Sequence, residues 1–343
     1  ESDRVDYGTL YAQRSKLLAK ACSRFVPDAA YETFVLENRE WLEDYAIFMA
    51  LKNSMGGKIW LEWPEELKCH DASALAAKRL ALKAEVELQY FLQYQFDRQW
   101  KALRSYAGGK GIRIIGDVPI YVPLDSADVW ADPKSFQLDE KNVPVEVAGV
   151  PPDYFSADGQ LWGNPLYNWD LMEADGFGWW IRRVGSATRL YDVLRIDHFR
   201  GLESYWAVPY GETTAKIGRW VKGPGMDLVG VLTRWFPNIQ LIAEDLGYLT
   251  PEVQQLLKDS SLSGMKVLEF AFDSRDSGSA NDYLPHNYPD NCIAYTGTHD
   301  NNTLLGYLWE LEPSLRQNML AYCGHEANWE AGLKSIIRTV YQS

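Results

Sequence analysis

The stretch DVLRIDH at residues 192–198 decides the fold, because it is a short apolar run that ends in charged residues. The run IQLIAED at 239–245 follows the same pattern, and further short apolar runs lie at 112–118, 265–272 and 292–298. Helical patterns separate several of these runs. Strand, helix and strand in succession predict a parallel sheet with crossover helices. The runs place apolar residues on both faces of each strand, so we expect both faces of the sheet to be covered.

Helical periodicity fills the first hundred residues and the spaces between the strands. We predict helices at 8–25, 39–54, 72–107, 213–222, 227–236, 251–259 and 313–323. In the longest of them, Leu80, Phe91, Tyr94 and Leu103 recur at about helical spacing. We therefore expect these four side chains to pack in a core.

The segment 119–177 is rich in proline and is too long for a simple connection between a strand and a helix. We interpret it as a functional excursion over the site.

The composition excludes several classes of partner. The 343-residue chain carries a net charge of -13, which repels phosphate backbones and anionic lipid heads. We therefore expect no nucleic acid and no membrane partner. No apolar run approaches the roughly 20 residues of a membrane span. Trp and Tyr are numerous, with 14 and 20 copies, and some of them could cover the apolar face of a sugar ring.

The four cysteines lack the spacing of a zinc site. Free thiols are typical of a reducing compartment, so we expect a cytoplasmic protein, or a plastid protein if the source is a plant. The residues imply no metal and no cofactor.

Acidic residues lie at the ends of four predicted strands: Asp117, Asp197, Glu244 and Asp300. In a parallel α/β barrel the carboxyl ends of all strands surround one mouth, where active sites lie. One such residue could simply cap a helix. Four of them on separate strand–helix units indicate a catalytic site.

The neighbours of two acids predict different chemistry for each. Arg195 and Asp197 are two residues apart on a strand and point to the same side, so the guanidinium favours an ionised carboxylate. Glu244 ends an apolar strand, where loss of water raises a carboxyl pKa and suits a general acid and base. Retaining glycoside chemistry needs such a pair, separated by about 5–5.5 Å.

Structural interpretations of the same residues stay open. Asp197 and His198 could form a satisfied buried pair, Asp245 could cap the helix near 251, and Glu244 could lie in a salt bridge. His299 beside Asp300 suggests a metal site, but neighbours on a strand point in opposite directions.

At these residues the sequence resembles the 4-α-glucanotransferases of the amylomaltase, or disproportionating-enzyme, family, which are relatives of the α-amylases. The resemblance spans nearly the whole chain. It rests on the segments at 85–100, 116–133, 147–169, 195–209 (RIDHFRGLESYWAVP), 243–253 (AEDLGYLTPEV) and 297–303 (GTHDNNT).

The resemblance implies a role for each matching residue. Asp197 corresponds to the nucleophile and Glu244 to the acid/base, while Asp300 corresponds to the residue that grips sugar hydroxyls and helps distort the ring. Arg195 and His299 match positions that contact the nucleophile and the sugar.

Further sugar-contacting positions follow from the same resemblance. Asp117 matches the acidic position after the third barrel strand. Tyr154, Phe155 and Trp162 lie in the proline-rich segment, which corresponds to a lid over the substrate. Phe270 corresponds to a secondary glucan contact.

The implied fold is a (β/α)₈ barrel, incomplete in this chain. Residues 1–107 are then a helical insertion before the third strand, 108–343 are the catalytic barrel portion, and 119–177 form the lid excursion. The family's first two strands are expected before Glu1 and its last strand after Ser343.

Three functions stay open at this stage. The first is transfer of α-1,4-glucan segments, such as maltooligosaccharides derived from starch or glycogen, to a new 4-hydroxyl by double displacement. The second is hydrolysis of the same glucan by the same carboxylates. The third is a non-catalytic glucan-binding barrel, which predicts the loss of at least one carboxylate.

Overall fold

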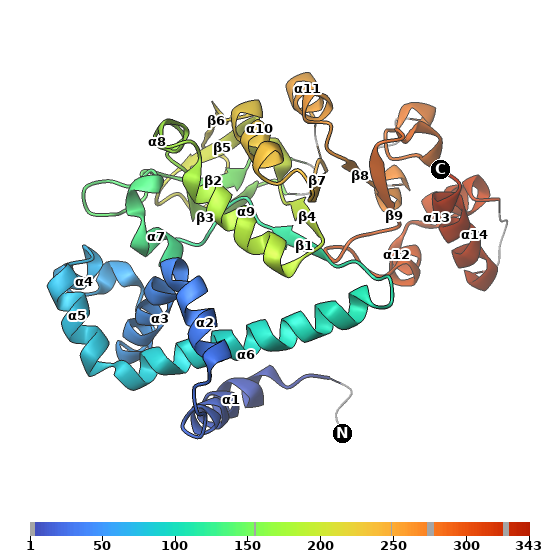
Figure 1. Cartoon of the computed structure of the whole chain (residues 1–343). Helices are drawn as coiled ribbons and strands as arrows, with labels where there is room; N and C mark the ends of the chain where they lie inside the picture. Colours follow the sequence, from blue (N-terminus) through green and yellow to red (C-terminus); the bar gives the residue numbers. More distant parts are fainter. Residues whose placement is uncertain (1–3, 154–155, 248, 273–277, 325–328) are drawn as a thin grey trace. The chain divides into compact units, whose positions relative to one another are not determined.

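A computed structural model shows how the chain folds (Figure 1). The residues that it describes are 4–153, 156–247, 249–272, 278–324 and 329–343. Over these residues, each helix is either too short or too polar to cross a membrane.

The chain forms two compact units, and each unit draws on separate parts of the sequence. Unit 1 comprises residues 1–114, 121–179 and 206–221, and unit 2 comprises residues 115–120, 180–205 and 222–343.

Unit 1 begins with a group of helices: α1 (Tyr7–Cys22), α2 (Ala29–Glu37), α3 (Arg39–Ser54), α4 (Glu65–Lys68), α5 (Ala72–Ala81) and α6 (Lys83–Gly108). Helix α3 forms because Leu42, Ala46, Ala50 and neighbouring apolar residues recur on one face, and these residues are fully buried. Leu42 packs with Phe34 of α2 and Tyr94 of α6 in a shared core. Helix α6 therefore holds the helical group together.

The remainder of unit 1 contains a four-stranded sheet with the strand order β3-β2-β5-β6. Its strands are β2 (Glu146–Val150), β3 (Gln160–Pro165), β5 (Ser204–Pro209) and β6 (Arg219–Lys222), accompanied by the short helices α7 (Ala127–Ala131) and α8 (Trp169–Ala174). β2 pairs antiparallel with both β3 and β5. The proline-rich segment 119–177 thus contains more regular structure than its composition indicates.

Unit 2 contains the parallel strands, in the order of the sequence: β1 (Ile115–Val118), β4 (Val193–Ile196), β7 (Gln240–Ala243), β8 (Gly264–Val267) and β9 (Cys292–Tyr295). β4 pairs with β1 on one side and with β7 on the other. β8 pairs with β9. An isolated parallel bridge between Ile242 and Ser263 connects the two sets. All five predicted strands are confirmed, each shorter than the apolar run that predicted it.

The helices of unit 2 follow the strands, as expected for crossover connections. They are α9 (Gly178–Leu190), α10 (Met226–Trp235), α11 (Pro251–Ser260), α12 (Leu304–Glu310), α13 (Pro313–Tyr322) and α14 (Trp329–Tyr341). The predicted helices at 227–236, 251–259 and 313–323 are confirmed within a residue or so. Apolar residues of β4 and β7, including Val193, Leu194 and Ile242, are buried, as the apolar character of both runs predicts.

The side chain of Asp245, just after β7, connects to β8 by a hydrogen bond. Its carboxylate accepts the backbone N–H of Met265 at 2.6 Å, and burial raises its pKa. The suggestion that Asp245 caps the helix near residue 251 is therefore wrong. Thr250 is the cap of α11, since its hydroxyl accepts the N–H of Val253.

One predicted helix forms two helices in the structure, and another is wrong. The pattern at 72–107 is broken at Leu82, where α5 ends and α6 begins. Local propensity favours helix throughout this stretch, so the division reflects tertiary structure, in which α5 contacts both α3 and α4. The segment 213–222, all of which the structure describes, contains no helix and ends in strand β6. Just before the strand, Gly218 lies against the indole of Trp206, where a Cβ would approach within 2.5 Å.

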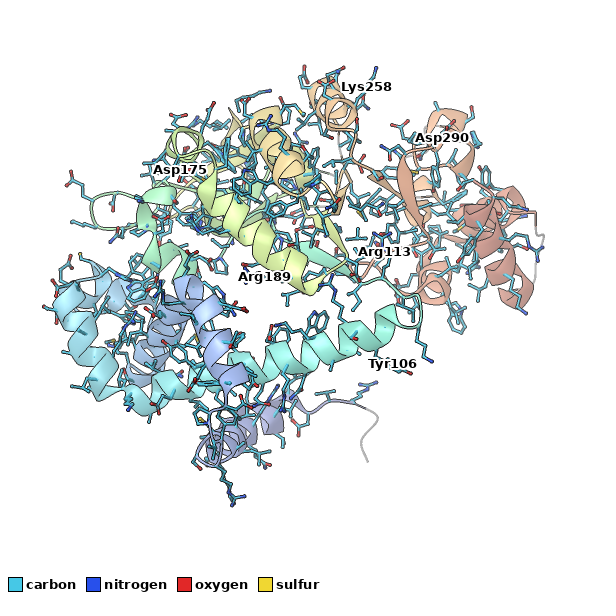
Figure 2. The ribbon with its side chains drawn as sticks, viewed as in Figure 1. Tyr106, Arg113, Asp175, Arg189, Lys258 and Asp290 are labelled. Carbon is cyan, nitrogen blue, oxygen red and sulfur yellow. The ribbon has the colours of Figure 1, made fainter. Side chains whose placement is uncertain are left out.

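The predicted apolar face of the long helix is only partly buried. Phe91 and Tyr94 are in the core, whereas Leu80 and Leu103 are 78% and 53% exposed. Tyr106, labelled in Figure 2, is likewise exposed near the C-terminal end of α6. In the first half of α6, Phe91 and Tyr94 are therefore buried, whereas Leu103 and Tyr106 in its second half are exposed.

Gly116 in β1 offers a test of this packing. A Cβ at this position would lie 2.0 Å from the ring of Tyr191, so Gly116→Ala must displace a half-buried aromatic ring. We expect a loss of about 1–3 kcal/mol of unfolding free energy. Denaturant unfolding measures this loss. Gly108→Ala is the matched control, because a Cβ there meets nothing within 4 Å. Equal stability of the two variants would contradict the packing at β1.

Candidate active site

Arg195 lies at the centre of a cluster of carboxylates in unit 2. It is on β4 directly opposite Asp117 of β1, and its side chain is largely buried. Its Nη1 lies 2.6 Å from Oδ1 of Asp117 and 2.8 Å from Oδ1 of Asp197. Arg195 and Asp197 therefore lie on the same side of the sheet, as their two-residue spacing predicts. One guanidinium thus pairs with two carboxylates.

Glu244 follows the last residue of β7, as Asp197 follows the last residue of the neighbouring β4. The two strands are in register, since Ile196 pairs with Ala243. Two backbone donors hold the Glu244 carboxyl: Oε2 accepts the N–H of His198 at 2.8 Å, and Oε1 accepts the N–H of Leu246 at 2.9 Å. The carboxyl is therefore fixed in place by backbone donors.

Burial raises the pKa of Glu244 from its ordinary value of 4.5 to about 7. The two N–H donors and Arg195 lower the pKa and Asp197 raises it, but loss of water is the largest effect. The predicted environment of a general acid and base is therefore present at this carboxyl. Near neutral pH it can both donate and accept a proton.

Burial also raises the pKa of Asp197, and here Arg195 is the largest opposing influence. Asp117 and Asp300 add to the rise because their negative charges disfavour a further one. Arg195 therefore lowers the pKa of Asp197, as the sequence predicts, but burial is the larger influence and the net shift is upward.

His198 has a role that the sequence did not predict. Its backbone is left-handed, with φ 50° and ψ 48°, and in this conformation its N–H reaches Glu244. Gly201 lies beside it, and a Cβ there would approach the imidazole within 3.0 Å. Burial lowers the pKa of the imidazole to about 3, so the ring is neutral at physiological pH. No sequence pattern marks this backbone donor.

His299 and Asp300 lie beyond the end of β9, in an exposed turn. The expectation that they point in opposite directions along a strand is wrong, because the strand ends at Tyr295. Instead, Nε2 of His299 lies 3.5 Å from Oδ1 of Asp300. The charge of Asp300 acts on the pKa of Asp197, which associates this turn with the cluster around Arg195.

The aromatic residues predicted to contact sugar are distributed over both units. Phe270, in the turn after β8, packs edge-on against Tyr283, with the ring centres 5.3 Å apart. In unit 1, Trp162 on β3 is partly exposed, and its indole N–H donates to Gln160. Tyr154 and Phe155 lie outside the described residues.

A pair of carboxyl groups on neighbouring parallel strands, one near neutral pKa and the other beside an arginine, is typical of enzymes that break and form glycosidic bonds. A model of the glycoside hydrolase 77 family, described as 4-alpha-glucanotransferase, matches residues 1–343. The chain belongs to this family.

Individual relatives agree with this assignment. A 4-alpha-glucanotransferase of Thermus thermophilus is 47% identical over 355 residues, covering 98% of this chain and 70% of the relative. One of Clostridium butyricum is 44% identical over 345 residues, covering 99% and 70%. The solved amylomaltase from Streptococcus agalactiae in complex with acarbose superposes with a TM-score of 0.93 at 39% identity, covering 98% of this chain and 68% of that one.

The raised pKa of Glu244 predicts a pH-dependent stability. Between pH 4.5 and 7 the unfolded chain releases a proton that the folded chain retains, so this group's contribution to stability is lost as pH rises through 7. Glu244→Gln removes the titration. We expect denaturant unfolding to show that the variant gains on the order of 2 kcal/mol relative to the parent between pH 5 and pH 8.

An exposed carboxyl provides the control for that experiment. Glu173 on α8 is exposed, and Glu173→Gln should follow the pH dependence of the parent. If the parent and Glu244→Gln changed in parallel between pH 5 and pH 8, the burial of the Glu244 carboxyl would be contradicted.

Proposed function

We propose that Asp197 and Glu244 perform a retaining double displacement on α-1,4-glucan. The family is that of the glucan transferases, and the amylomaltase from Streptococcus agalactiae holds acarbose. The observation that carries the proposal is the placement of the two carboxyls at the ends of paired strands, with Arg195 bound to Asp197 and two backbone donors on Glu244.

In the first step, a carboxylate oxygen of Asp197 attacks the anomeric carbon of a glucosyl unit. The bond from that carbon to the bridging oxygen breaks, and Glu244 gives its proton to the departing 4-oxygen. The product is a glucosyl ester on Asp197, and Glu244 is left ionised. This direction of proton transfer requires Glu244 to begin protonated, and its pKa of about 7 supports this.

In the second step, the 4-hydroxyl of another glucan approaches the ester. Glu244 removes its proton, the oxygen bonds to the anomeric carbon, and the ester bond to Asp197 breaks. Two inversions restore the α configuration, and both carboxyls return to their starting states. The separation of about 5–5.5 Å between the carboxyls that this chemistry needs stays a prediction.

The other site residues receive supporting roles in this proposal. Asp300 and His299 hold sugar hydroxyls from their exposed turn, and Asp300 helps to distort the ring. Arg195 and Asp117 orient the nucleophile. Tyr154, Phe155 and Trp162 are sugar contacts of the lid, and Phe270 is a secondary glucan contact. The partial exposure of Trp162 supports a stacking role.

For the fold, we propose that the five parallel strands are consecutive strands of a (β/α)₈ barrel, with residues 1–107 as a helical insertion and 119–177 as the lid. The chain-order arrangement of β1, β4, β7, β8 and β9 supports this. We also propose a reducing compartment, either the cytoplasm or a plant plastid, because all four cysteines are free thiols.

Incubation with maltotriose separates transfer from hydrolysis. Transfer passes a glucan to a second sugar, so we expect a ladder of longer maltodextrins together with glucose. Chromatography of the products over time measures this. A product mixture of maltose and glucose alone would mean that water is the acceptor and would refute the transferase function.

Replacing either catalytic carboxyl tests the assignment of roles. Asp197→Ala removes the nucleophile and Glu244→Ala removes the acid/base, so we expect each to lower kcat by about 10³-fold or more. Initial rates of glucose release from maltotriose measure this. Asp259→Ala on α11 is the control, because Asp259 is exposed and its carboxylate binds only the nearby Gln255 side chain among the bonds described. Activity within tenfold of the parent in either catalytic variant would overturn the assignment.

A further inference from the structure

Glu244, the proposed acid/base, begins the loop between β7 and α11, and the backbone of this loop binds its carboxyl. Two residues after Glu244, the N–H of Leu246 points back to Oε1 at 2.9 Å. The next residue, Gly247, has φ +87°, a conformation that glycine adopts without strain. The N–H of Gly247 donates to the hydroxyl of Tyr283 at 3.2 Å. A side chain from a distant part of unit 2 therefore binds the loop next to the donor of Glu244.

Tyr283 is itself held from several sides. Its backbone N–H donates to Oδ1 of Asn281 at 2.8 Å, and its carbonyl accepts the hydroxyl of Tyr288 at 2.9 Å. Its ring packs edge-on against Phe270, and Nζ of Lys266 lies 5.3 Å from the ring centre. The hydroxyl therefore presents a fixed acceptor to the loop.

We propose that Tyr283 is a positioning residue for the acid/base: its hydroxyl fixes Gly247 and thereby holds the Leu246 N–H on the Glu244 carboxyl. The inference rests on the proposed role of Glu244. Tyr283 acts through the loop and is not assigned a contact with the reacting atoms. The bond matters because a backbone donor to a carboxylate stabilises the ionised form.

Loss of the hydrogen bond between Gly247 and Tyr283 should change the pKa of Glu244 in one direction. Without the Tyr283 hydroxyl, the Leu246 N–H spends less time on Oε1, so the Glu244 carboxylate loses a donor and its pKa rises. Among the described residues, the ionisable groups that act on the pKa of Glu244 are Arg195 and Asp197, and Lys266 faces Tyr283. All three are unchanged in a variant that removes only the hydroxyl. Glu244 should then lose its proton at a higher pH than in the parent.

The test compares Tyr283→Phe with Tyr322→Phe in the whole protein. Tyr322 is the matched control because its hydroxyl also accepts a backbone N–H, that of His286, but away from the loop. For Tyr283→Phe we expect kcat to fall about tenfold with little change in KM. We also expect the alkaline limb of the kcat profile to move up by about half a pH unit. Tyr322→Phe should leave both quantities at the parent values.

Two further measurements do not depend on activity. Amide hydrogen exchange at Gly247 should be faster in Tyr283→Phe than in the parent. The ¹³C chemical shift of the Glu244 carboxyl, assigned by its loss in Glu244→Gln, should titrate at a higher pH. Unchanged exchange and an unchanged titration would overturn the inference even in an active enzyme. Faster exchange and a shifted titration in a protein without transferase activity would support the anchor and reject the proposed function.

Discussion

The pairing of one arginine with two carboxylates is the interaction on which the site depends. Asp117, Asp197 and Glu244 come from three neighbouring parallel strands, and the register of those strands brings their negative charges together. Arg195 lies between Asp117 and Asp197 and offsets part of their repulsion. The guanidinium is also held from a third side, since its Nε donates to the sulfur of Met265. The close approach of the carboxyls thus depends on both the strand register and the charge of Arg195.

The two central carboxyls differ in their hydrogen-bond partners, although burial is the main cause of the raised pKa of each. Asp197 pairs with the side chain of Arg195, whereas Glu244 accepts hydrogen bonds from two backbone N–H groups. Burial raises the pKa of both. The division of labour in the proposed mechanism follows from this contrast: a carboxyl near neutral pKa exchanges protons, and a carboxylate beside a permanent cation attacks carbon.

The elements that could be located best from the sequence are those whose structure depends mainly on burial. The apolar runs that became β4 and β7 could be located because strands covered on both faces are apolar throughout, and the acids could be located because they end those runs. The break at Leu82 and strand β6 were not predictable, since they depend on tertiary contacts, such as those of α5 with α3 and of Gly218 with Trp206, that local preference does not encode. The donors to Glu244 were also missed. They are backbone groups, and the left-handed His198 has no signature in the residue type.

The seam between β7 and β8 has a mechanical consequence. Within the described part of the chain, an isolated bridge with the bond from the Ala243 N–H to the Ser263 carbonyl, together with the Asp245 carboxylate, connects the two strands in place of a regular ladder. A small shear of β8 and β9 against β4 and β7 therefore disrupts few backbone hydrogen bonds. Phe270 and Asp300 follow β8 and β9, whereas Asp197 and Glu244 follow β4 and β7. The residues proposed to contact the sugar therefore lie on one side of this seam, and the two carboxyls proposed to react with it lie on the other side.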